Sequence, residues 1–294
     1  GGVVAYRIEL YNSVEGEHLF EFLRRSEVAG ARFYDRRFEF YHGQLVPTVA
    51  EGPFVDQITE SSAIISWDTD QPVTGTVVVE GVGDFVASNG DDTHLEGPLT
   101  GLGAGATYTY SVQVTDGIST TTTRQYFFRT PAQDTTEFTF AVMGDSRSGL
   151  GGGEYDFNGV NGLAMRSLAT SAFNNGAEFI LHTGDLINGY TDNELDYEMQ
   201  FESFKDTVEH VGHYIPIYEM MGNHEALVDA YLAPDFSLQM FDKEGGSEIV
   251  FADEFVNPTN GPEPDNVAAN APPGESLPPY KESVYYFDYG NSRF

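Results

Sequence analysis

Three segments in the second half of the chain each pass from apolar residues into a glycine followed by a polar side chain. They are Gly144–Asp145, Gly184–Asp185 and Gly222–Asn223–His224. Glycine lets the backbone turn sharply where a strand ends, at the edge of the sheet where open α/β proteins bind ligands. Two carboxylates, an amide and an imidazole suit hard or borderline divalent and trivalent metal ions. The carboxylates alone could instead form an acid–base pair, but the asparagine favours a metal, because a neutral amide oxygen is a poor proton carrier and a good metal ligand.

The surrounding residues predict the elements that bring these segments together. Short apolar runs predict strands, and apolar residues at helical spacing predict helices. In chain order these are strand Phe138–Val142, helix Gly162–Asn174, strand Glu178–Leu181, helix Leu195–Val211 and strand Ile215–Met221. This order predicts a parallel βαβαβ unit, whose crossovers place all three strand ends at one edge. Asp145, Asp185, Asn223 and His224 should therefore converge.

The chain beyond Ala226 is expected to leave this unit as a long excursion. Asn257–Pro279 is rich in proline, asparagine and glycine, which predicts a loop over the surface. Val284–Tyr289 reads as a further strand, and Gly290–Asn291 as a turn after it.

The residues before this unit predict a separate all-β domain over residues 48–130. Short alternating runs such as Ser62–Trp67 and Thr76–Val79 are each bounded by turn residues, which is typical of a β-sandwich. The run Leu102–Tyr110, read with Trp67, resembles a fibronectin type III domain, and Tyr108 would be its tyrosine corner, bonded back to the backbone. Residues 131–136 read as a linker, and residues 1–47 as an unassigned α/β tail of an upstream region.

Three motifs resemble the first three motifs of the calcineurin-like metallophosphoesterases. They are GDSR at 144–147, GDLINGY at 184–190 and GNHE at 222–225, and YYFDYGN at 285–291 resembles the strand that follows in that family. With a fibronectin-like domain in front, the arrangement resembles purple acid phosphatases and their bacterial relatives. The resemblance implies a multidomain protein: an all-β sandwich, then an α/β metallophosphoesterase domain over residues 137–294 that is incomplete at its C-terminus.

The resemblance also implies roles for individual residues. Asp145 would ligate one metal ion, Asp185 would bridge two ions, and Asn223 would ligate the second. His224 would stabilise the transferring phosphoryl group or protonate the leaving oxygen, and Glu225 would hydrogen-bond His224 or a metal ligand. Two divalent or trivalent ions, from Fe, Zn, Mn or Mg, would activate a bridging hydroxide for in-line attack on phosphorus.

Two positions depart from the family pattern. Arg147 stands where many members place a ligating histidine, and its planar fork could clamp a substrate phosphate or form a structural salt bridge. Asn188 stands where purple enzymes place a ligating tyrosine, and it could be a ligand, a phosphate donor or a turn residue. No tyrosinate–iron colour is expected unless Tyr190 substitutes.

The family's remaining ligands are downstream histidines ending in a GHxH motif, which none of the seven histidines matches. His182 is expected to be packed at a strand end. The chain is therefore expected to be a C-terminally truncated piece that binds metal weakly and hydrolyses phosphate esters poorly, because three or four ligands cannot fill two coordination spheres.

The amino-acid composition limits the kinds of partner that the chain is expected to bind. The chain has 14 Lys+Arg against 46 Asp+Glu, a net charge of −32, and no cysteine. Nucleic-acid binding is not expected, because it depends on basic residues that displace counterions from phosphates. No apolar run approaches the ~20 residues of a membrane span. Acid-rich, cysteine-free composition favours an extracytoplasmic protein, secreted, periplasmic or at the cell surface, of a bacterium or archaeon in a saline setting.

The leading hypothesis is an acid phosphatase-like phosphomonoesterase that acts on a small phosphate ester. The alternatives are a phosphodiesterase or nucleotide hydrolase of the same fold, and a non-catalytic cell-surface binding protein with a degenerate site. The sequence indicates no oligomeric state.

Overall fold

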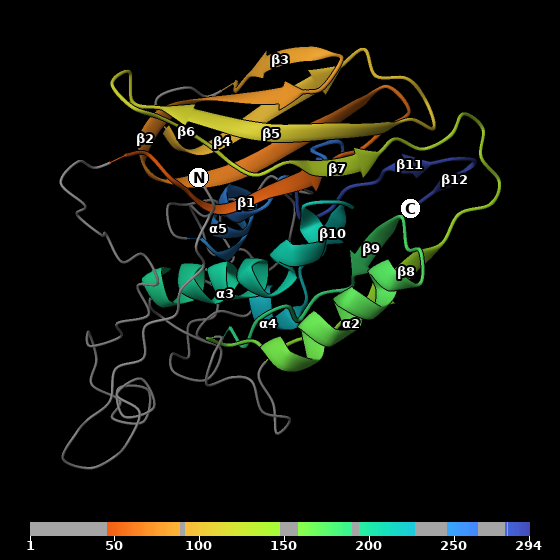
Figure 1. Cartoon of the computed structure of the whole chain (residues 1–294). Helices are drawn as coiled ribbons and strands as arrows, with labels where there is room; N and C mark the ends of the chain where they lie inside the picture. The colour runs from red at the N-terminus through yellow and green to blue at the C-terminus, as the bar shows by residue number, and fades with distance from the viewer. Residues whose placement is uncertain are drawn as a thin grey trace, which may run out of the picture.

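The computed structural model describes residues 46–88, 92–147, 158–189, 194–226, 246–263, 280 and 282–294. A β-sandwich lies against a smaller α/β unit, and helix α3 (Glu194–Gly212) runs next to strand β1 (Val49–Asp56) of the sandwich (Figure 1). The tail over residues 1–45 and the predicted loop from 264 onward lie outside the described residues.

The first unit is the all-β sandwich that the sequence predicts. After β1 its strands are β2 (Ser62–Val79), β3 (Gly83–Val86), β4 (Asp92–Thr100), β5 (Thr107–Thr115), β6 (Thr120–Thr122) and β7 (Tyr126–Arg129), all paired antiparallel. The prediction of two separate strands at Ser62–Trp67 and Thr76–Val79 is wrong, because β2 continues through both. Its first half pairs with β1 and β4, and its second half pairs with β3 and β5. The register of β2 against β4 shifts between Asp68 and Val73, so the pairing of these two strands is interrupted although β2 stays extended.

Trp67 and Tyr108 have the positions expected of a fibronectin type III-like sandwich. Trp67 is fully buried, and a Cβ placed on Gly75 would collide with its ring, so the tryptophan fits only against a bare backbone. Tyr108 is the expected tyrosine corner: its hydroxyl oxygen accepts a hydrogen bond of 2.6 Å from the backbone N–H of Gly103.

The second unit contains the predicted parallel βαβαβ arrangement. Its elements are β8 (Phe140–Met143), α2 (Gly162–Asn174), β9 (Phe179–His182), α3 and β10 (Ile217–Glu219). The sheet order is β10-β9-β8 with both pairings parallel, so all three strands end at the same edge. A short helix α4 (Asn223–Ala226) follows β10 directly.

Two predictions beyond residue 226 need correction. A helix, α5 (Ser247–Glu254), interrupts the expected excursion and buries Val250 and Phe251. The strand expected at Val284–Tyr289 is reduced to β11 (Asp288–Tyr289), which pairs with β12 (Ser292–Arg293) across the predicted turn. The side chain of Asn260 explains the shortening, because it accepts from the N–H of Tyr286 at 3.0 Å and donates to the carbonyl of Tyr286 at 2.8 Å. An amide side chain thus takes the place of a neighbouring strand.

The sheet of the α/β unit is covered differently on its two faces. Ile180 and Ile217 pack with helices α2, α3 and α5 in one core. Phe179 and Tyr218 instead join the core of the sandwich, together with Tyr289 of the terminal hairpin. The sandwich and the α/β unit therefore share one hydrophobic core.

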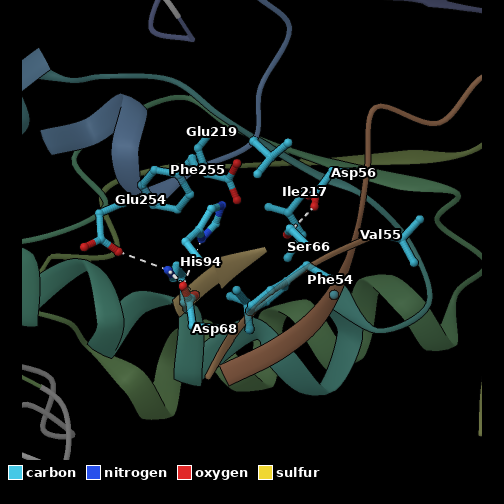
Figure 2. A pocket seen from close by; sticks show the side chains of 14 residues that line it. Phe54, Val55, Asp56, Ser66, Asp68, His94, Ile217, Glu219, Glu254 and Phe255 are labelled. Atoms are coloured by element: carbon cyan, nitrogen blue, oxygen red, sulfur yellow. Dashed lines mark hydrogen bonds and ion pairs between the residues drawn. The ribbon is translucent and has the colours of Figure 1, made fainter. Parts of the chain in front are cut away.

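A buried charge cluster also joins the two units, around Lys205 of α3. Two of its acids, Asp68 and Glu254, are labelled in Figure 2. The Lys205 ammonium lies 2.5 Å from Glu51, 3.3 Å from Asp68 and 3.0 Å from Glu254. Burial lowers the pKa of Lys205, but these facing carboxylates outweigh it and raise that pKa. Burial raises the pKa of Glu51, whereas Lys205 and His94 overcome burial to lower the pKa of Asp68. One ammonium is thus shared by three carboxyl groups.

Stability is expected to fall as the pH rises through neutrality. Burial raises the pKa of Asp56, bonded to Ser66, to about 7, and the pKa of Glu209, which accepts from Gly52, also to about 7. Both values lie above the ordinary carboxyl range, so the folded state binds more protons than the unfolded state between about pH 4 and 7. The stability that these acids contribute is complete below pH 4 and is lost as the pH rises through 7. The raised pKa of His94 acts in the same direction.

Thermal denaturation followed by circular dichroism checks this prediction. We expect a Tm lower by about 5 °C at pH 8 than at pH 5.5. The double variant Asp56→Asn, Glu209→Gln should show a smaller difference, because its side chains stay neutral. A Tm that is constant or rises between these pH values would contradict the assignment.

Candidate functional site

The site lies where β8, β9 and β10 end. Asp145 and Asp185 follow the first two strands, and both have φ of +54°, a left-handed conformation that non-glycine residues rarely adopt. Backbone bonds tie the two loops together: the Asp145 N–H donates to the Gly184 carbonyl and the Arg147 N–H to the Asp185 carbonyl, each at 3.1 Å. Such strain persists only where the surrounding structure enforces it, and it is common at functional sites.

The glycines of the motifs allow the loops to approach this closely. A Cβ on Gly222 would collide with the backbone nitrogen and the carboxylate of Asp185. A Cβ on Gly184 would lie 2.5 Å from the nitrogen of Gly222. The loops after β9 and β10 are therefore in direct contact, and any larger residue would separate them.

His224 is oriented by the loop that follows β9. Its Nδ1 lies 2.6 Å from the carbonyl oxygen of Asn188, which can only accept, so Nδ1 carries the proton of this bond. Its backbone N–H donates to Oδ1 of Asp185 at 3.1 Å, and its Nε2 lies 3.9 Å from Oδ2 of Asp185. The other ring nitrogen, Nε2, thus faces the Asp185 carboxylate. Asn188 contributes through its main chain, a role that the sequence did not indicate.

Arg147 pairs with Asp185 itself. Its Nε lies 3.5 Å from Oδ2 of Asp185, and 41% of its side chain is exposed. The salt bridge, one of the two alternatives for this residue, is therefore present in the structure, and the phosphate clamp stays a prediction.

Glu225 holds the loops of the site together. It is fully buried, and its carboxylate accepts three backbone N–H bonds, from Asp185 at 2.9 Å, Ile187 at 3.1 Å and Gly222 at 2.7 Å. Burial raises its pKa to about 7, with the three N–H bonds opposing that effect. The sequence predicted a hydrogen bond from Glu225 to His224 or to a metal ligand. In the structure the carboxylate accepts from three backbone N–H groups, and one of them belongs to Asp185.

Side chains of helix α3 form hydrogen bonds with the backbone of the loops around the site. Gln200 accepts from the Gly189 N–H at 2.8 Å, Tyr197 donates to the Glu225 carbonyl at 2.7 Å, and Ser203 accepts from the Asn158 N–H at 3.0 Å. The sequence predicted this helix at Leu195–Val211 but gave no role to Gln200 and Ser203. The signal that could have found them is that each precedes a large apolar residue of the helix, Phe201 and Phe204.

The donors at this edge fit a metal ion in type. Asp145, Asp185 and Asn223 offer oxygen atoms and His224 offers a nitrogen, which hard and borderline cations bind. Among the residues that the structure describes, no group of three or more His, Asp or Glu side chains is arranged to hold an ion. Asn223 and His224 directly follow Gly222, which packs on Asp185, so these residues lie at the same edge of the sheet.

The other histidines of the α/β unit pack against other parts of the fold. His182, the last residue of β9, is fully buried against Phe204, as predicted, and burial lowers its pKa to about 4. His210 contacts Thr170 at 2.7 Å, and His213 bonds the Pro53 carbonyl of the sandwich at 2.8 Å. Within the described ranges, His224 is thus the histidine of the loops that follow the three strands.

A parallel sheet with carboxylates, an amide and an imidazole at its strand ends is the arrangement of a metal-dependent hydrolase. The model of the calcineurin-like phosphoesterase family matches residues 139–291, more than half of the chain. The chain therefore belongs to the calcineurin-like phosphoesterase family, and it is a metal-dependent phosphoesterase. Members of this family normally use a dinuclear metal centre.

Among solved structures, the chain is similar to the sixth fibronectin type III domain of human fibronectin type III domain containing protein 3, with 17% identity, a TM-score of 0.26 and coverage of 33% of this chain and 97% of that one. It is also similar to the third fibronectin III domain of the human KIAA0343 protein, with 20% identity, a TM-score of 0.24 and coverage of 35% and 98%. No curated protein matches the sequence. None of the described helices is long and apolar enough to cross a membrane.

Proposed function

We propose that the chain hydrolyses phosphomonoesters, in the manner of an acid phosphatase, at a dinuclear metal centre on this sheet edge. The observation that carries the proposal is the position of His224, whose Nε2 faces the Asp185 carboxylate while its Nδ1 is bonded to the Asn188 carbonyl. A fixed imidazole beside a carboxylate at the strand ends suits the transfer of a proton to a leaving oxygen.

Asp145, Asp185 and Asn223 would hold the ions. When bound, two such ions supply Lewis acidity that neutralises phosphate oxygens and lowers the pKa of a nearby water. With the His224 imidazole protonated on both nitrogens, Nε2 would give its proton to the ester oxygen as the bond to phosphorus breaks, while Nδ1 keeps its proton in the bond to the Asn188 carbonyl. The partly exposed side chain of Arg147 would bind the phosphate oxygens through its guanidinium and orient the ester.

The expected partner is a small phosphate ester outside the cytoplasm. The net charge of −32 repels nucleic acids, whose binding needs clusters of lysine and arginine. A small ester is repelled less and meets Arg147 at the sheet edge. The same acidic composition is our reason for proposing a secreted, periplasmic or cell-surface location.

Hydrolysis of p-nitrophenyl phosphate and of bis(p-nitrophenyl) phosphate with added Mn²⁺ tests the proposal. We expect slow, metal-dependent hydrolysis that is faster for the monoester, and a fall of at least about 100-fold in Asp185→Ala. Asp134→Ala, which changes an exposed aspartate of the linker, should keep the wild-type rate. Faster hydrolysis of the diester would favour a phosphodiesterase, and equal rates in the wild type and Asp185→Ala would overturn the site.

A further inference from the structure

We infer that Gln200 is a positioning residue that sets the orientation of the His224 imidazole; this inference rests on the proposed role of His224. Gln200 lies on α3 and does not border the sheet edge. Its connection to His224 passes through two consecutive residues of the loop after β9, Asn188 and Gly189.

The first link is the bond between Gln200 and Gly189. The side chain of Gln200 is only 4% exposed, and its Oε1 accepts from the Gly189 N–H at 2.8 Å. Gly159 packs against the same side chain so closely that a Cβ there would collide with Oε1 and Cδ of Gln200. The acceptor is thus held in place by the helix on one side and by Gly159 on the other.

The second link is the contact between Gly189 and His224. Gly189 has φ of +56°, and a Cβ on it would overlap the carbonyl oxygen of His224. The preceding residue, Asn188, presents the carbonyl that accepts from Nδ1 of His224 at 2.6 Å. Because Asn188 and Gly189 share one peptide unit, fixing the Gly189 N–H also fixes the plane of the Asn188 carbonyl. Gln200 thereby determines where that carbonyl points.

The consequence concerns the two nitrogens of the imidazole. With the Asn188 carbonyl held in place, the neutral ring keeps its proton on Nδ1 and presents Nε2 to the Asp185 carboxylate, 3.9 Å away. Without the acceptor on Gln200, the peptide unit between Asn188 and Gly189 can rotate. The Asn188 carbonyl then no longer holds the proton on Nδ1 of His224. The ring then populates both tautomers.

The test uses folded protein, without metal or substrate, labelled with ¹⁵N-histidine and observed by NMR at about pH 8.5, where an ordinary imidazole is neutral. Gln200→Met removes the acceptor at similar length, and Gln200→Asn withdraws it by one methylene if the methionine variant does not fold. Ser203→Ala is the matched control: it removes buried hydrogen bonds of the same helix, to Asn158 and to the Met199 carbonyl, and keeps the bond from Gly189 to Gln200. His224→Gln identifies the His224 signals.

We expect one tautomer of His224, protonated on Nδ1, in the wild type and in Ser203→Ala. We expect mixed tautomers in the Gln200 variants, with exchange of the Gly189 amide hydrogen at least about tenfold faster. An unchanged His224 tautomer in a folded Gln200 variant would overturn the inference. Because this readout needs no turnover, a failed phosphatase assay leaves it intact, and its failure leaves the proposed function intact.

Discussion

Replacing Lys205 by methionine is expected to lower the free energy of unfolding by about 3–5 kcal/mol at pH 7, as removal of one partner from a buried ion cluster does. Methionine keeps the length and most of the apolar stem of lysine but removes the charge. Glu51, Asp68 and Glu254 would then face one another without a cation, in a place where the lysine side chain is only 8% exposed. Urea denaturation followed by tryptophan fluorescence measures the loss, since Trp67 lies in the shared core.

A surface ion pair provides the comparison for this variant. Arg293 and Asp288 form a bidentate pair on the terminal hairpin, at 2.7 and 2.8 Å, and both side chains are more than half exposed. Arg293→Met should therefore leave the unfolding midpoint unchanged, because exposed pairs contribute little. The loss in Lys205→Met should also shrink at pH 5, where the orphaned acids take up protons. A Lys205→Met protein as stable as the wild type at pH 7 would show that the cluster does not join the two units.

The second large effect is expected for Glu225→Ala. The substitution leaves the N–H groups of Asp185, Ile187 and Gly222 without their acceptor in a fully buried place. Each buried unsatisfied amide costs about 1–3 kcal/mol, so we expect a loss of at least about 3 kcal/mol. The loops after β9 and β10 should also separate, and exchange of these three amide hydrogens should accelerate. Hydrogen exchange and urea denaturation together measure both effects.

Glu225→Gln separates the loss of acceptors from the loss of volume. Glutamine keeps one carbonyl oxygen, so it should retain part of the protection and lose about half as much stability as alanine. Amide protection that remains at the wild-type level in Glu225→Ala would mean that the carboxylate does not hold the loops.

The elements of the fold that local sequence patterns determine could be predicted. The helical spacing of Tyr197, Phe201 and Phe204 and the apolar runs at β8, β9 and β10 specify βαβαβ, because hydrophobic periodicity is a local property. The strand ends at Asp145 and Asp185 follow from the same pattern together with glycine. Tyr108 was predictable because the tyrosine corner bonds a residue only five positions away, Gly103.

The parts that could not be predicted depend on partners that are distant in the sequence. Asn260 completes the backbone bonds of Tyr286, and Lys205 meets Asp68 across 137 positions of sequence. The spacing of apolar residues along the sequence carries no information about such distant pairings. Helix α5 was missed because it is only eight residues long and lies in polar surroundings. In the site, the residue types were predictable, whereas the role of the Asn188 carbonyl and the backbone partners of the Glu225 carboxylate depend on how the loops pack.

The shared core has a consequence for any attempt to divide this chain. Deleting the sandwich at residue 131 would remove the partners of Phe179, Tyr218 and Tyr289, and would leave Lys205 facing Glu254 without Glu51 and Asp68. An isolated catalytic unit would therefore expose an aromatic surface and be prone to aggregate. The two units should unfold together in one cooperative transition, so that thermodynamically the described part of the chain behaves as a single domain.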